Sequence, residues 1–106
     1  MTRLKQGKRV PAEAVITRMQ AIANPARLEI MALIENREFT AGDIAYQLEK
    51  SQSLTAYHLG ILVVTGLLVR RSVGRYRYYR LASVDVSILA ATVNRLVGKN
   101  YDPIIS

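Results

Sequence analysis

The chain has 106 residues, about the size of one domain. Hydrophobic residues make up 50% of it, which is enough for one modest core and argues against a wholly disordered chain. It contains no cysteine, so disulfide scaffolds, thiolate metal sites and cysteine nucleophiles are excluded. Its longest apolar runs, such as 61–64, are far shorter than the ~20 residues of a membrane helix, and no apolar signal segment follows the basic start. We expect a small cytoplasmic domain without membrane contact.

The positive charge lies in two short segments. The chain carries 15 Lys and Arg against 8 Asp and Glu, which gives a net charge of +7. Residues 1–9 hold four basic residues and residues 70–80 hold five arginines, and neither segment has an acidic residue. Clustered charge of one sign attracts nucleic acid or an anionic surface, although it can also be a merely solvated face.

Two helices are predicted in the first third of the chain. Residues 1–10 are expected to form a flexible basic arm, and apolar residues then recur at helical spacing over 12–22. Asn24-Pro25 is a typical helix start, because Asn caps the first turn and Pro at the first helical position loses no hydrogen bond. The second helix is predicted to run from there to about Glu35.

A third helix is predicted over roughly 41–49, after a connection at 36–39. Thr40, followed three residues later by Asp43, resembles a capping box that begins this helix.

A fourth helix is predicted to begin after Ser51, which can cap it, and to end near 64–65. Gly66 follows in the usual position for a left-handed C-terminal residue. Two short helices joined by such a turn are typical of a helix-turn-helix.

The periodicity then changes from helix to strand. Residues 67–72 and 75–81 are rich in β-formers, with a hairpin turn predicted at Val73-Gly74. Ser83 is expected to cap a last helix over about 84–98. The order α-α-α-α-β-β-α defines a mainly α fold with a small β-hairpin, a winged helix-turn-helix. We place this domain at 11–99 and a C-terminal tail at 100–106.

The second helix of a helix-turn-helix lies in the major groove with its N-terminal half against base edges. Gln52 suits adenine, because its amide can make paired hydrogen bonds. Leu59 and Leu62 should point inward with Thr55 on the same stripe, and Leu54 faces either the groove or the turn. The DNA contacts predicted for this helix are Ser51, Gln52, Ser53, Thr55, Ala56, Tyr57 and His58.

Three of these positions have a purely structural alternative. Ser51–Ser53 could serve only as helix caps. Tyr57 could donate its hydroxyl to a phosphate or bury its ring. His58, the only histidine, is more typical of a half-buried hydrogen-bonded residue than of a ligand.

The hairpin is the more specific signal for DNA. Side chains alternate along a strand, so Tyr79 and Leu81 are expected on the core side. Five arginines without lysine or acid favour phosphate binding over a solubilising role, because a guanidinium binds phosphate through paired hydrogen bonds. The wing contacts predicted for phosphate or an adjacent minor groove are Arg70, Arg71, Arg75 and Arg77.

Several stretches together carry a family resemblance. They are Ala23–Ile30, Asp43–Ala45, Ser51–Ser53, His58-Leu59, Gly66-Leu67 and Gly74–Leu81. With these the chain resembles the ArsR-type family of bacterial and archaeal winged-helix repressors, over about residues 12–98. The resemblance implies a homodimer that represses transcription from a palindromic operator. It also implies a dimer interface of the first and last helices, for which we name Val15, Ile16, Met19, Ile88, Leu89, Thr92, Val93 and Leu96.

The usual metal sites of that family are absent. Many arsenic or lead sensors have cysteines at the positions of Thr40 and Gly42. Zinc and nickel sensors use one Asp and three His of the last helix, and of these only Asp85 matches. The other three positions hold Ser87, Gly98 and Tyr101. One oxygen ligand cannot hold a transition metal here. We therefore expect no metal and no cofactor, and the sequence does not identify an effector.

Two functional classes compete with a DNA-binding repressor. The helix predicted from 52 is poor in charge, which favours a winged-helix protein-interaction module that has lost operator reading. An enzyme has little support, because the chain offers one His, no Cys, no glycine-rich phosphate loop and no evident pair of carboxylates.

Overall fold

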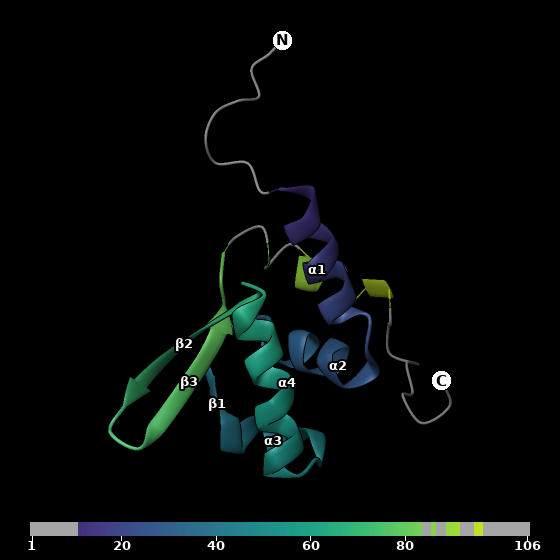
Figure 1. The fold of residues 1–106 in the computed structure, drawn as a ribbon. Helices are drawn as coiled ribbons and strands as arrows, with labels where there is room; N and C mark the ends of the chain where they lie inside the picture. The colour runs from purple at the N-terminus through teal and green to yellow at the C-terminus, as the bar shows by residue number, and fades with distance from the viewer. Residues whose placement is uncertain (1–10, 84–85, 87–88, 92–94, 97–106) are drawn as a thin grey trace.

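The computed structural model describes residues 11–83, 86, 89–91 and 95–96. Four helices and three strands follow one another over residues 12–81 (Figure 1). Their bounds are α1 Ala12–Ile22, α2 Pro25–Leu33, β1 Phe39–Thr40, α3 Ala41–Leu48, α4 Gln52–Val64, β2 Leu68–Val73 and β3 Tyr76–Leu81. The architecture is a winged helix-turn-helix, mainly helical, with α3 and α4 as the helix-turn-helix and β2–β3 as the wing.

Side-chain caps begin three of the helices at the expected residues. The Asn24 carboxamide oxygen accepts a hydrogen bond from the Arg27 amide at 3.1 Å, with Pro25 at the first helical position. Ser51 accepts from the Leu54 amide at 3.0 Å at the start of α4. Thr40 likewise caps α3. Each cap satisfies one of the amide groups that a helix start leaves unpaired, so the short helices begin where the sequence predicts.

The sheet has one strand more than predicted. Segment 36–39 is not only a connection, because Phe39–Thr40 forms the short strand β1 against β3, with Phe39 opposite Tyr79. Burial of both aromatic rings on one face stabilises this pairing. The order is β1-β3-β2, all antiparallel.

The hairpin turn is one residue later than predicted. Val73 and Tyr76 form the last strand pair, so the turn is Gly74-Arg75 and not Val73-Gly74. Gly74 has φ of 59°, a left-handed conformation that glycine adopts without strain.

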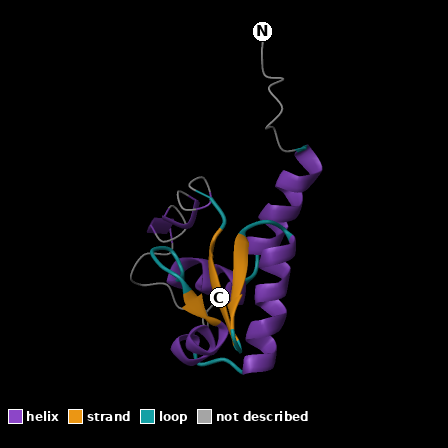
Figure 2. Ribbon diagram, turned by 90° about the vertical axis from the view of Figure 1, so that its left-hand side faces the viewer, coloured by secondary structure: helices purple, strands orange, loops and turns teal. Residues whose placement is uncertain are grey.

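One core joins the helices to the sheet. Residues of α2, α3 and α4 meet the inner face of the hairpin, and the side chains that are almost fully buried are Ile30, Met31, Ile34, Ile44, Leu59, Leu62, Leu67 and Leu68. The hairpin lies to one side of the helices and extends beyond them (Figure 1), and Figure 2 looks onto that side. The wing is therefore anchored at its base and projects at its tip.

The last predicted helix lies partly outside the described residues. Ser83 accepts a hydrogen bond from the Val86 amide at 3.2 Å, as expected of a cap, and 86, 89–91 and 95–96 are helical. The predicted arm at 1–10 and tail at 100–106 lie outside the described residues. Among the described residues, no helix has both the length and the apolar character needed to cross a bilayer.

Candidate nucleic-acid interface

The first half of α4 presents an uncharged surface. Gln52, Ser53, Ala56 and Tyr57 are exposed, as is the cap Ser51 before them. Leu54, left between two orientations by the sequence, is 45% exposed and therefore faces outward. These side chains form an uncharged surface of hydroxyl, amide and apolar groups, the kind that reads base edges.

Thr55 does not belong to that surface. Its side chain is 1% exposed and lies on the buried stripe with Leu59 and Leu62. Its hydroxyl has no hydrogen-bond partner. The prediction that Thr55 contacts DNA is wrong, because a helix that packs Leu59 and Leu62 into the core must also turn the residue four positions before Leu59 inward.

His58 is likewise buried, at 6% exposure, which corrects its assignment as a DNA contact. Arg27 of α2 donates from Nη1 to His58 Nδ1 at 3.0 Å, and its Nε donates to the Ala21 carbonyl at the end of α1. Burial, and then the charges of Arg27 and Lys50, lower the pKa of His58. The neutral imidazole therefore ties the middle of α4 to α2 and α1.

The arginines of the wing divide between its two faces. Residues directly opposite each other share a face, so Arg70 lies with Tyr79 and Ser72 lies with Arg77 on the face that continues from the core. Arg71 lies with Tyr78 on the other face. Alternation along the strands therefore splits a continuous basic segment into two sets.

Arg71 is already bound within the chain. Its Nε and Nη2 donate to the two carboxylate oxygens of Glu38, each at 2.8 Å, and its guanidinium lies 4.8 Å from the centre of the Tyr78 ring. Glu38 immediately precedes β1. The role of Arg71 as a phosphate contact stays a prediction, because its side chain is exposed but already paired with an acid distant in sequence.

A concavity joins the start of α4 to the wing. It has a volume of about 440 Å³ and is open to solvent. The cap and first turn of α3 form one wall, Gln52 of α4 the second and the wing tip the third. Its lining residues are Thr40, Ala41, Gly42, Asp43, Gln52, Arg75, Tyr76 and Arg77. Two of the predicted wing arginines and the predicted adenine reader therefore lie around one hollow.

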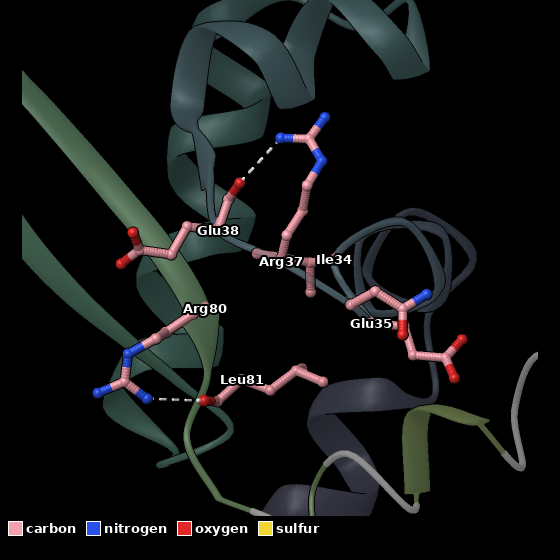
Figure 3. A pocket seen from close by; sticks show the side chains of 7 residues that line it. Ile34, Glu35, Arg37, Glu38, Arg80 and Leu81 are labelled. Carbon is pink, nitrogen blue, oxygen red and sulfur yellow. Dashed lines mark hydrogen bonds between the residues drawn. The ribbon is translucent and has the colours of Figure 1, made fainter.

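A smaller hollow of about 280 Å³ lies between the end of α2 and the base of β3 (Figure 3). Arg37 donates to the Glu38 carbonyl and Arg80 to the Leu81 carbonyl, both at 3.2 Å. The guanidinium groups of both arginines are thus hydrogen-bonded to main-chain oxygens. We do not assign this hollow to the nucleic-acid interface.

Two features of this surface were not predicted from the sequence. Glu38 was not connected to the wing, because β1 itself was not predicted and nothing local to Glu38 indicates Arg71. The sequence predicts Asp43 only as a capping residue, yet it lines the concavity. Strand alternation around Phe39 is the signal that would have placed Glu38 on the face of Tyr78.

The chain is similar in sequence to known proteins. The model of the bacterial regulatory protein family arsR matches residues 24–69. The transcriptional activator HlyU of Vibrio cholerae is 31% identical over 93 residues, which are 88% of this chain and 85% of HlyU. The transcriptional repressor SdpR of Bacillus subtilis is 31% identical over 75 residues, which are 71% of this chain and 80% of SdpR.

A solved relative has the same fold. Mb0332 of Mycobacterium bovis, a homodimeric winged helix-turn-helix DNA-binding domain, superposes with a TM-score of 0.72 at 28% identity, covering 85% of this chain and 88% of that one. Fold and site thus define a DNA-binding transcriptional regulator of the winged helix-turn-helix class. The chain belongs to the ArsR family, whose members regulate transcription and are not enzymes.

A metal-binding site would need several ligand side chains close together. No group of three or more His, Asp or Glu side chains in the described part of the chain could hold a metal ion. The positions of Asp85, Ser87, Gly98 and Tyr101 lie outside the described residues.

We predict that Thr55→Val stabilises the protein without weakening DNA binding. Valine is close in shape to threonine and removes an unpaired buried hydroxyl, so the free energy of unfolding should rise by about 1 kcal/mol. Urea unfolding and a duplex titration measure the two quantities. Thr65→Val is the matched control, because the Thr65 hydroxyl donates to the Ile61 carbonyl at 2.9 Å and its loss should destabilise. Lost DNA affinity at unchanged stability would show instead that Thr55 contacts DNA.

We also predict acid-sensitive stability from His58. Its pKa in the folded state is lower than in the unfolded chain, where it is about 6.5. The unfolded state therefore binds the proton more readily, and the free energy of unfolding should fall as the pH drops from about 6.5 towards the folded pKa. His58→Gln keeps an acceptor for Arg27 and should remove this loss. Urea unfolding at several pH values tests the claim, and equal pH dependence in both proteins would refute it.

Proposed function

We propose that the protein is a cytoplasmic homodimer that represses transcription by binding a palindromic operator in double-stranded DNA. The concavity between Gln52 and the wing arginines carries this proposal, because it presents a base-reading helix and phosphate-binding cations to one duplex. The family supports the DNA partner.

The two parts of the surface have different tasks in this proposal. The exposed residues of α4 enter the major groove, where Gln52 pairs with adenine, Ser51 and Ser53 contact phosphate or base, Ala56 meets a thymine methyl group and Tyr57 donates to a phosphate. Arg70, Arg75 and Arg77 of the wing bind phosphates or enter the neighbouring minor groove. Since α4 carries no charged side chain on this surface, affinity comes mainly from the wing and specificity mainly from the helix.

An exposed apolar surface on α1 supports the homodimer. Val15, Ile16 and Met19 are about half exposed, and Leu96 is 81% exposed. Val15, Met19 and Leu89 also line a mostly apolar groove of about 340 Å³ between α1 and the last helix. Such a surface is typical of an interface, and Mb0332 is a homodimer. We propose that the partner covers it, with Ile88, Thr92 and Val93, which lie outside the described residues, completing the interface.

Repression is the regulatory direction that we propose. The relatives include an activator, HlyU, and a repressor, SdpR. A small dimer that binds an operator represses most simply by occupying it and blocking access to the promoter. The position of the operator relative to the promoter tests this point.

One observation favours a second function. Helix α4 has no Asp, Glu, Lys or Arg, its one histidine is buried, and Leu54, Tyr57 and Val64 are exposed on it. An uncharged helix with exposed apolar groups also suits a protein partner, so a protein-interaction module without operator reading is the alternative.

Substitutions in the concavity separate these functions. Arg75→Ala should weaken binding to all duplexes and reduce the slope of log affinity against log salt by about 0.9. Gln52→Ala should reduce discrimination between operator and random duplex by about 1–3 kcal/mol. Fluorescence anisotropy with DNA from upstream of the protein's own gene measures both. Arg37→Ala is the control, because it removes the same charge outside the concavity. Wild-type binding by both concavity variants would contradict the proposal, and a stable protein complex without DNA affinity would favour the alternative.

A charge on α1 should break the dimer. Met19→Glu places a carboxylate on the proposed interface, where its desolvation should weaken the dimer by about tenfold or more. Sedimentation measures the dimer dissociation constant, and circular dichroism checks that the variant folds. Val64→Glu is the control, since it places the same charge on an exposed apolar position of α4. Equal effects of both variants, or none from either, would contradict the proposed interface.

A further inference from the structure

A charged network crosses the sheet on the face of Tyr78, which is opposite to the face of Arg77 and Tyr79. Glu38 precedes β1, Tyr78 lies in the central strand β3, and Arg71 lies in the edge strand β2. The Glu38 carboxylate accepts two hydrogen bonds from Arg71, each at 2.8 Å, and the guanidinium stacks over Tyr78. Paired geometry and stacking restrict Arg71 more than a single exposed ion pair would. The network thus links the edge of the wing to the body of the domain.

The network lies where the wing loses its third strand. Strand β1 pairs only with Tyr78 and Tyr79 of β3, whereas β2 pairs with β3 as far as Val73 and Tyr76. Beyond Tyr78 the wing is therefore a two-stranded ribbon, which is marginally stable alone. Arg71 is opposite Tyr78, at the base of that ribbon. A contact at this point sets the direction in which the ribbon leaves the sheet.

The electrostatic surroundings of Glu38 and Arg71 favour the charged form of both side chains. The hydrogen bonds from Arg71 lower the pKa of Glu38 most, and the charges of Arg71 and Arg80 lower it further. The pKa of Arg71 is raised by the same hydrogen bonds. Both groups therefore stay ionised around neutral pH and hold the paired geometry.

We propose that Glu38 is a positioning residue for DNA binding, which braces the wing through Arg71 so that Arg75 and Arg77 stay beside α4. Arg71 is then a structural brace and not a phosphate contact. The inference rests on the proposed DNA-binding function. It goes beyond it because it assigns opposite roles to neighbouring arginines, and a DNA-binding role to an acidic residue.

The direction in which Glu38→Gln changes the affinity for DNA tests whether Glu38 braces the wing. Glu38→Gln removes a negative charge near a DNA-binding surface, so electrostatics alone would tighten binding, and release of Arg71 to bind phosphate would tighten it further. The brace predicts the reverse, with affinity for duplex DNA about threefold to tenfold weaker, because the ribbon loses its fixed direction. Glu13→Gln is the matched control, since it removes an exposed acid from α1.

A second substitution separates the two roles of Arg71. Arg71→Lys keeps the positive charge and removes the paired hydrogen bonds. A brace predicts that Arg71→Lys weakens DNA binding as much as Glu38→Gln does, that the double variant is no weaker than either, and that the salt slope is unchanged. A phosphate contact predicts near wild-type affinity for Arg71→Lys, because lysine also binds phosphate as a point charge.

Amide hydrogen exchange provides a readout without DNA. In Glu38→Gln, amides of residues 72–77 should exchange about tenfold faster while those of α4 keep their rates. Tighter or unchanged DNA binding by Glu38→Gln, or unchanged exchange in the wing, would overturn the inference. Lack of duplex binding by the wild-type protein would instead refute the proposed function, and the exchange experiment would still test the brace.

Discussion

The alternation of side chains along β3 is the constraint on which the interface depends. Tyr79 and Leu81 enter the core and fix which face of the strand meets the helices. Arg77 must then lie on that same face, beside the start of α4, whereas Tyr78 must lie on the other. A shift of one residue in the pairing of β3 would turn Arg77 away and bury a different set of residues. The position of Arg77 is thus a consequence of core packing.

Charged and uncharged groups lie on different elements of this surface, the wing and helix α4. The wing supplies fixed cations, whose attraction to phosphate depends little on sequence. In the proposed complex, helix α4 supplies uncharged groups that read base edges. The helix is held from behind, through Arg27 and His58 in its middle and through the Nε of Arg18, which donates to the Thr65 carbonyl at its end. Both anchors reach toward α1, so the recognition helix is fixed to the helix that we assign to the dimer.

Local signals in the sequence were sufficient to predict most of the helices and the hairpin. Asn24-Pro25, Thr40 and Ser51 act through their nearest neighbours, and each begins a helix in the structure. Strand β1 and the Glu38–Arg71 pair depend on residues about 33 to 40 positions apart, which no local pattern encodes. The surface of α4 was partly predictable, since the inward stripe of Leu59 and Leu62 includes Thr55. His58 was expected to be half-buried, but the arginine that binds it lies 31 residues away.

The central claim is that one DNA duplex contacts both α4 and the wing, and tethered cleavage tests it most directly. The chain has no cysteine of its own, so a single cysteine can be introduced at a chosen position and labelled. Ser53→Cys and Ser72→Cys are nearly isosteric changes at exposed positions of α4 and of the wing. Each would carry a single iron–chelate group that cuts nearby DNA. If one duplex lies across both elements, the two proteins should cut the same half-site a few base pairs apart. Cleavage from only one of the two positions, at equal occupancy of the DNA, would contradict a shared surface.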